Sequence, residues 1–145
     1  MSEYRRLLLV VDLTEDSLLI GRRAQAIATA TGAQIDLLHV VEYVPVEPMG
    51  ETLMPAIQIE DEMLDRAKQR LITLGAKIGV PAESCRVEAG NVKSEIVRIA
   101  RELHTDLIVL GSRERHGLSI LVNFTEDTVL HASPCDVLAV RVGRT

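Results

Sequence analysis

The sequence has few residues suited to covalent or metal chemistry. Its only cysteines, Cys85 and Cys135, form neither a CxxC motif nor a metal-ligand spacing. Its four histidines show no metal-ligand spacing and no sequence pairing with a serine or cysteine nucleophile. These absences argue against a zinc site, a redox dithiol and a hydrolase triad. We expect both cysteines to be reduced thiols that act as small, buried or half-buried apolar residues.

Aromatic residues and positive charge are also scarce. Aromatic residues make up 2% of the chain, and the formal net charge is −5. Surfaces that bind nucleic acids carry an excess of Lys and Arg, so we expect no nucleic-acid partner. The early apolar run Leu7–Val11 is too short for a signal peptide or a membrane span, and Asp12 interrupts it. The sequence therefore predicts a cytoplasmic protein with no membrane partner.

The chain does contain a pattern of aliphatic residues, in which segments with the spacing of strands alternate with segments with the spacing of helices. Its 145 residues are close to the usual size of one domain, and we expect a single domain over residues 1–145. Continuous or alternating apolar runs predict five strands. These cover residues 7–11, 35–41, 85–89, 107–110 and 137–142.

Apolar residues at helical spacing predict a helix in each connection. The first has Thr14, Asp16 and Ser17 as N-cap candidates and ends at Gly32. The second begins near Ile57 and runs for about twenty residues. The third carries an apolar stripe from Ile96 to Leu103, and the last lies around residues 129–132.

One segment fits neither pattern. Residues Glu42 to Pro55 include three prolines and a glycine, which disfavour both a helix and a central strand. We expect a long loop there. Loops of this length in compact domains often serve as lids or partner surfaces, and a plain surface loop is the alternative.

The alternation of strands and helices predicts a doubly wound α/β fold, an open five-stranded parallel sheet with helices on both faces. The first and fourth strands are the most apolar, so we expect them to be central and adjacent. Ligands in such folds bind at the carboxyl ends of the strands, where the strand order reverses. Asp12 and Gly111 are therefore expected beside one crevice. Asp12 has two possible roles: accepting hydrogen bonds from a ligand, or capping the first helix together with Thr14.

The segment from Thr105 to Asn123 is the strongest candidate site. It joins a strand, Gly111, a polar loop and a helix start near Asn123, an arrangement that can bind phosphate. The segment lacks the Walker lysine and the dinucleotide-binding glycine pattern, and Ser112 lacks the context of a hydrolase nucleophile.

The sequence resembles the universal stress protein family, and its UspA branch in particular, over nearly its whole length. The resemblance rests on four segments in the right order, namely residues 7–12 (LLLVVD), 39–41 (HVV), 106–112 (DLIVLGS) and 134–140 (PCDVLAV). It implies the strand order 3-2-1-4-5 and a homodimer. One branch of the family binds ATP or AMP through the motif G-x2-G-x9-G-[S/T].

That resemblance implies adenine and ribose contacts at Asp12 and at the backbone near Val41. It also implies phosphate contacts at residues of the glycine loop and the following helix start, which are Gly111, Ser112, Arg113, Asn123, Phe124 and Thr125.

The phosphate motif is only partly present. Gly111 and Thr125 match it, but the second glycine is replaced by Glu114 and the third by Phe124, or by Asn123 if the loop is one residue shorter. A glutamate carboxylate repels a triphosphate, and a Cβ prevents close approach of the backbone to a phosphate. The sequence therefore favours the UspA branch, with no cofactor and with weak or no binding of ATP or AMP.

The last strand is apolar and expected at a sheet edge, where unpaired backbone groups invite pairing. The predicted homodimer interface consists of Val137, Leu138, Ala139, Val140, Arg141 and Val142. The leading hypothesis is thus a cytoplasmic, non-catalytic stress-response protein that binds itself and acts by binding unknown protein partners or a small ligand. The alternatives are a nucleotide switch that binds ATP or AMP with slow or no hydrolysis, and an unrelated small α/β enzyme, which the lack of a nucleophile–base pair disfavours.

Overall fold

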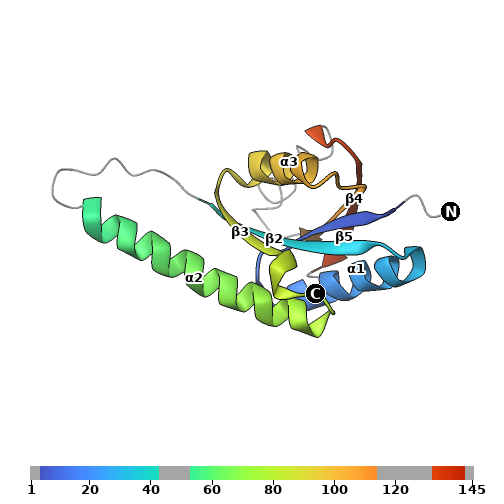
Figure 1. Ribbon diagram of the computed structural model, residues 1–145, viewed down its shortest axis with the longest axis horizontal. Coiled ribbons are helices and arrows are strands. Elements are labelled where there is room, and N and C mark those ends of the chain that lie inside the picture. The colour runs from blue at the N-terminus through green and yellow to red at the C-terminus, as the bar shows by residue number, and fades with distance from the viewer. Residues whose placement is uncertain (1–3, 43–52, 114–131, 143–145) are drawn as a thin grey trace.

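The chain forms one five-stranded sheet with helices on both faces. The computed structural model describes residues 4–42, 53–113 and 132–142, and it describes residues 53–60 and Arg113 by their backbone alone. All strands are parallel, in the order β3-β2-β1-β4-β5 (Figure 1), which confirms the predicted fold class and strand order. The elements are β1 (Arg6–Val10), α1 (Ser17–Thr31), β2 (Gln34–Glu42), α2 (Leu53–Lys77), a 3-10 turn η2 (Ala82–Ser84), β3 (Cys85–Gly90), α3 (Val92–Glu102), β4 (Leu107–Arg113) and β5 (Asp136–Val142).

Two apolar layers separate the sheet from its helices. Leu7 and Leu9 of β1 pack in the layer beneath α1 and α2, whereas Leu8 packs in the layer beneath α3. Figure 1 shows α1 and α2 on one face of the sheet and α3 on the other. Because alternate residues of a strand point to opposite faces, a strand covered on both sides must be apolar throughout. This explains why β1 and β4 read as continuous aliphatic runs.

The segment between β2 and α2 is shorter than predicted. The predicted loop Glu42 to Pro55 was wrong at both ends, since Glu42 is the last residue of β2 and α2 begins at Leu53 instead of near Ile57. Pro55 is the third residue of this helix. Proline is tolerated in the first turn of a helix because the N–H groups there have no partner within the helix.

The strand β4 is longer than predicted, and its glycine does not end it. Gly111, Ser112 and Arg113 continue the strand, pairing with Val140, Arg141 and Val142 of β5. Packing gives one reason for a glycine here. A Cβ on Gly111 would lie 2.6 Å from Cδ1 of Ile20, a buried residue of α1. Gly111 therefore lets α1 pack closely against the sheet.

Helix limits follow local rules where the structure describes them. Gly32 adopts a left-handed conformation (φ 76°) and donates its N–H to the carbonyl of Ala28 at 2.8 Å, so it ends α1 as predicted. Asn91 begins α3, and its Oδ1 accepts the N–H of Ser94 at 3.0 Å. Most of the predicted last helix lies outside the described residues. Its residue Ala132 is described and is helical.

Polar contacts tie together the amino ends of three strands. Asp36 interrupts the apolar pattern of β2 and is 6% exposed. Its Oδ2 lies 2.8 Å from Nη2 of Arg6 on β1, which compensates the buried charge. Next to β4, Oδ2 of Asp106 accepts the N–H groups of Arg5 and Arg6 at 2.8 and 2.9 Å. These bonds to the charged form lower the pKa of Asp106.

Candidate functional site

Asp12 is the second residue after β1, at the carboxyl edge of the sheet. Its Oδ1 accepts hydrogen bonds from the N–H of Thr14 at 3.1 Å, from the Thr14 hydroxyl at 2.7 Å and from the Ser17 hydroxyl at 3.3 Å. Ser17 is the first residue of α1 and is 3% exposed. Asp16 occupies the N-cap position but makes no capping bond with its side chain. The structure thus supports the helix-start role considered for Asp12, and the same bonds orient its carboxylate.

Two other elements hold the backbone around Asp12. His39 of β2 donates from Nδ1 to the carbonyl of Val11 at 2.8 Å, and Val11 donates its N–H to the carbonyl of Leu38 at 3.0 Å. From α2, Nη2 of Arg70 donates to the carbonyl of Leu13 at 2.5 Å. The sequence pattern drew attention to His39 at a strand end. It held no signal for Arg70, because 57 residues separate it from Leu13.

The described part of the predicted site gathers at one edge of the sheet. The register pairs Leu9 of β1 with Val109 of β4. Two residues later, Gly111 is still in β4, and Val11 is the first residue after β1. This confirms the predicted adjacency of the first and fourth strands. Val41 lies near the carboxyl end of β2, which flanks β1 on its other side.

The rest of the predicted phosphate site is only partly described. Ser112 is half-buried in β4, and Arg113 ends that strand, where its backbone pairs with Val142. Asn123, Phe124 and Thr125, together with Glu114, lie outside the described residues. The contacts implied for them remain predictions.

Few other residues in the described ranges suggest chemistry. Cys85 is buried and Cys135 half-buried, as predicted, and both are free. Burial raises the pKa of each thiol, so both favour the protonated, unreactive form. No group of three His, Cys, Asp or Glu side chains able to hold a metal occurs within 4–42, 61–112 and 132–142.

A family model describes nearly the whole chain. The model of the universal stress protein family matches residues 3–141. The chain belongs to the universal stress protein family. Universal stress protein A homolog 1 of Coxiella burnetii is 34% identical over 138 residues, covering 94% of this chain and 96% of the relative. Homolog 2 of the same organism is 31% identical over 144 residues, covering 98% of each chain. The resemblance found in the sequence is therefore confirmed.

Solved structures share the fold of this universal stress protein. UspA from Lactobacillus plantarum superposes with a TM-score of 0.71 at 23% identity, covering 97% of this chain and 100% of that one. A universal stress protein in complex with cAMP superposes with a TM-score of 0.65 at 22% identity, covering 98% and 100%. In the described ranges, no helix has the length and apolarity needed to cross a bilayer.

Proposed function

We propose that this universal stress protein is a cytoplasmic, non-catalytic stress-response protein whose adenine-nucleotide crevice binds nucleotide weakly or not at all. The observation that carries the proposal is the meeting of β1 and β4 where the strand order reverses, with Asp12 just beyond the carboxyl end of β1 and Gly111 in the second half of β4. This is the place where open α/β sheets bind ligands. A structural relative in complex with cAMP supports an adenine nucleotide as the ligand class.

The replaced motif glycines support weak binding. Glu114 stands where the family motif has its second glycine, and Phe124 or Asn123 stands at the third. A carboxylate beside a triphosphate is repulsive, and the repulsion grows as water is excluded. We expect that the double variant Glu114→Gly, Phe124→Gly gains affinity for ATP in a calorimetric titration. An unchanged affinity would instead favour the alternative, a switch that binds ATP or AMP with slow or no hydrolysis.

Mass spectrometry of the purified protein gives a direct test. Native and denatured spectra are compared for nucleotide that copurifies with the chain. An empty protein that also shows no heat with millimolar ATP supports the proposal. Near-stoichiometric ATP, ADP or AMP contradicts it and supports the nucleotide switch.

We also propose that the protein forms a homodimer through β5 and binds other protein partners, whose identity is open. Within the described residues, β5 pairs with β4 on one side only. Leu138 of this edge strand is 37% exposed, an apolar side chain that a second copy would cover. An isologous pairing of two β5 strands is the symmetric arrangement that achieves this.

A further inference from the structure

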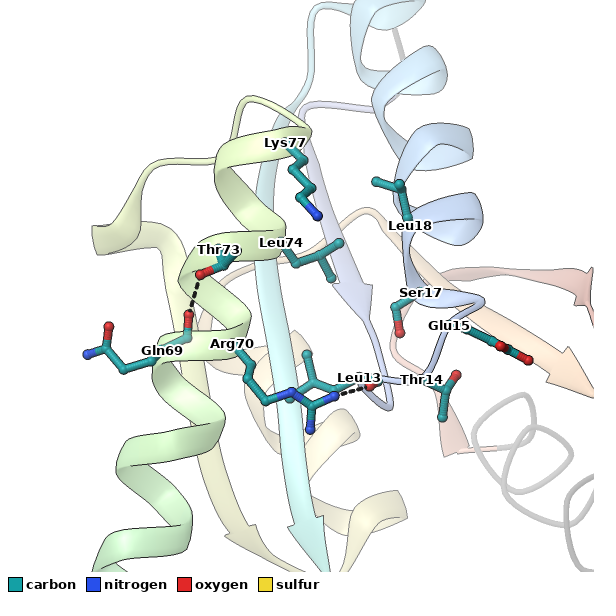
Figure 2. Close-up of a pocket in the computed structure, with 10 residues that line it drawn as sticks. All are labelled: Leu13, Thr14, Glu15, Ser17, Leu18, Gln69, Arg70, Thr73, Leu74 and Lys77. Carbon is teal, nitrogen blue, oxygen red and sulfur yellow. Dashed lines mark hydrogen bonds between the residues drawn. The ribbon is translucent and has the colours of Figure 1, made fainter.

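A cavity of about 470 Å³ lies between α1 and α2, and its described lining includes none of the residues predicted to contact nucleotide. Its walls are the loop after β1, the first turn of α1 and the last two turns of α2 (Figure 2). Leu13, Leu18 and Leu74 supply its apolar surface, and all three are half-buried. The volume is within the range of cavities that hold small molecules.

Helix α2 presents two cations to this cavity. Arg70, Leu74 and Lys77 are spaced by four and then three residues, so they share one face of the helix. Figure 2 shows the Lys77 amine and the Arg70 guanidinium both directed into the space between the helices. In a protein of net charge −5, this pair makes the cavity wall locally positive.

The two cations are not neutralised by the residues that the structure describes. Arg70 donates from Nη2 to the carbonyl of Leu13 at 2.5 Å, which fixes the guanidinium and leaves its other N–H groups for a ligand. Lys77 is exposed and has no hydrogen-bond or ion-pair partner among the described residues. Glu15 is the acid among the described lining residues, and its side chain points away from both cations (Figure 2).

The loop opposite the cations has an unusual backbone. Leu13 adopts a left-handed conformation with φ 59°, which non-glycine residues rarely do. This conformation directs its carbonyl to Arg70 and places its side chain at the cavity. Backbone strain of this kind is concentrated at binding and active sites.

We propose that this cavity binds small amphiphilic anions, which carry a carboxylate or phosphate on a short apolar body. Arg70 and Lys77 would hold the anion, while Leu13, Leu18 and Leu74 contact the apolar part. The ligand would be held by ion pairs to cations that are already in place and partly by burial of its chain. The proposal requires no nucleotide at Asp12 or Gly111, so it stands or falls independently of the proposed function.

The test is an NMR titration of the whole protein, labelled with nitrogen-15, against hexanoate and hexyl phosphate up to about 20 mM, the range of weak binding. We expect saturable shifts in the amides of Leu13, Leu18, Leu74 and Lys77 with at least one probe. The two probes distinguish a carboxylate from a phosphate ligand. Hexanol, which has the same chain without the charge, should cause no saturable shift.

Variants separate the proposed site from general charge effects. Lys77→Gln and Arg70→Gln should each weaken binding about fivefold or more, the loss expected for one charge-assisted contact. Arg66→Gln is the control, because Arg66 is exposed on α2 one turn earlier and does not line the cavity. The proposal is overturned if neither anion binds, if hexanol binds as well as the anions, or if the shifts map to residues away from the cavity. It is also overturned if Arg66→Gln weakens binding as much as the cavity variants do, or if Lys77→Gln leaves the affinity unchanged.

Discussion

At the scale of single residues, Gly111 shows how one missing Cβ allows a helix to pack. A Cβ there would lie 2.6 Å from Cδ1 of Ile20. We expect Gly111→Ala to lower the free energy of unfolding by about 1–3 kcal/mol, the usual cost of overpacking. Ile20→Val removes that Cδ1 and should cost about 0.5–1.5 kcal/mol alone. Urea unfolding of the double variant should show a smaller loss than the sum. Additive losses would mean that Ile20 does not limit the space at Gly111.

Asp106 gives a residue-scale prediction for pH. Its pKa is lowered chiefly by the N–H groups of Arg5 and Arg6, which bond its carboxylate. A carboxyl group whose pKa is lower in the folded state than in the unfolded state stabilises the fold at pH values above the unfolded-state pKa, which is about 3.9 for Asp. This stabilisation is lost as the pH falls through the folded-state pKa. The free energy of unfolding should therefore be higher for the wild type than for Asp106→Asn. This difference should be largest at pH 5 and above and should shrink towards pH 2. A difference that stays constant over this range in urea titrations would contradict the role given to the charge.

At the scale of elements, the start of α3 depends on one side chain. Asn91 Oδ1 accepts the N–H of Ser94 at 3.0 Å, which satisfies one of the helix's unpaired donors. We expect Asn91→Ala to cost about 1 kcal/mol in unfolding free energy, measured by urea denaturation. Asn91→Asp preserves a cap acceptor and is the matched control. Equal losses in both variants would show that the cap bond is not the cause.

At the scale of the whole molecule, the proposed dimer predicts which surface sets the mass in solution. Val140 is 8% exposed, so a charge there would disturb the core, whereas Leu138 is 37% exposed on the same strand. Leu138→Lys should shift the protein from twice the chain mass of 15.9 kDa towards that mass, as measured by light scattering. The edge of β5 that has no strand partner among the described residues would then carry a charge that opposes pairing.

A second exposed leucine supplies the control for that experiment. Leu19 on α1 is 45% exposed and lies outside β5. Leu19→Lys should leave the mass unchanged. A Leu138→Lys protein that keeps the wild-type mass, or a Leu19→Lys protein that dissociates, would remove β5 as the interface.

The architecture of this protein could be predicted from its amino-acid sequence. The local apolar pattern of a strand indicates whether one or both of its faces are covered. The central positions of β1 and β4 and the edge position of the half-exposed β3 were therefore predictable. The adjacency of β1 and β4 followed from the same reasoning. Element ends were less predictable, because Pro55 is compatible with a first helical turn and Gly111 with a strand.

The contacts between residues far apart in the sequence could not be predicted. The pairing of Arg6 with Asp36, the contact of Arg70 with Leu13 and the closeness of Gly111 to Ile20 join residues on different elements. Such contacts depend on the packing angle and offset of a helix against the sheet, which no local period encodes. For the same reason, the cavity between α1 and α2 could not be predicted from the sequence. The residues that line it become neighbours only when the two helices lie side by side.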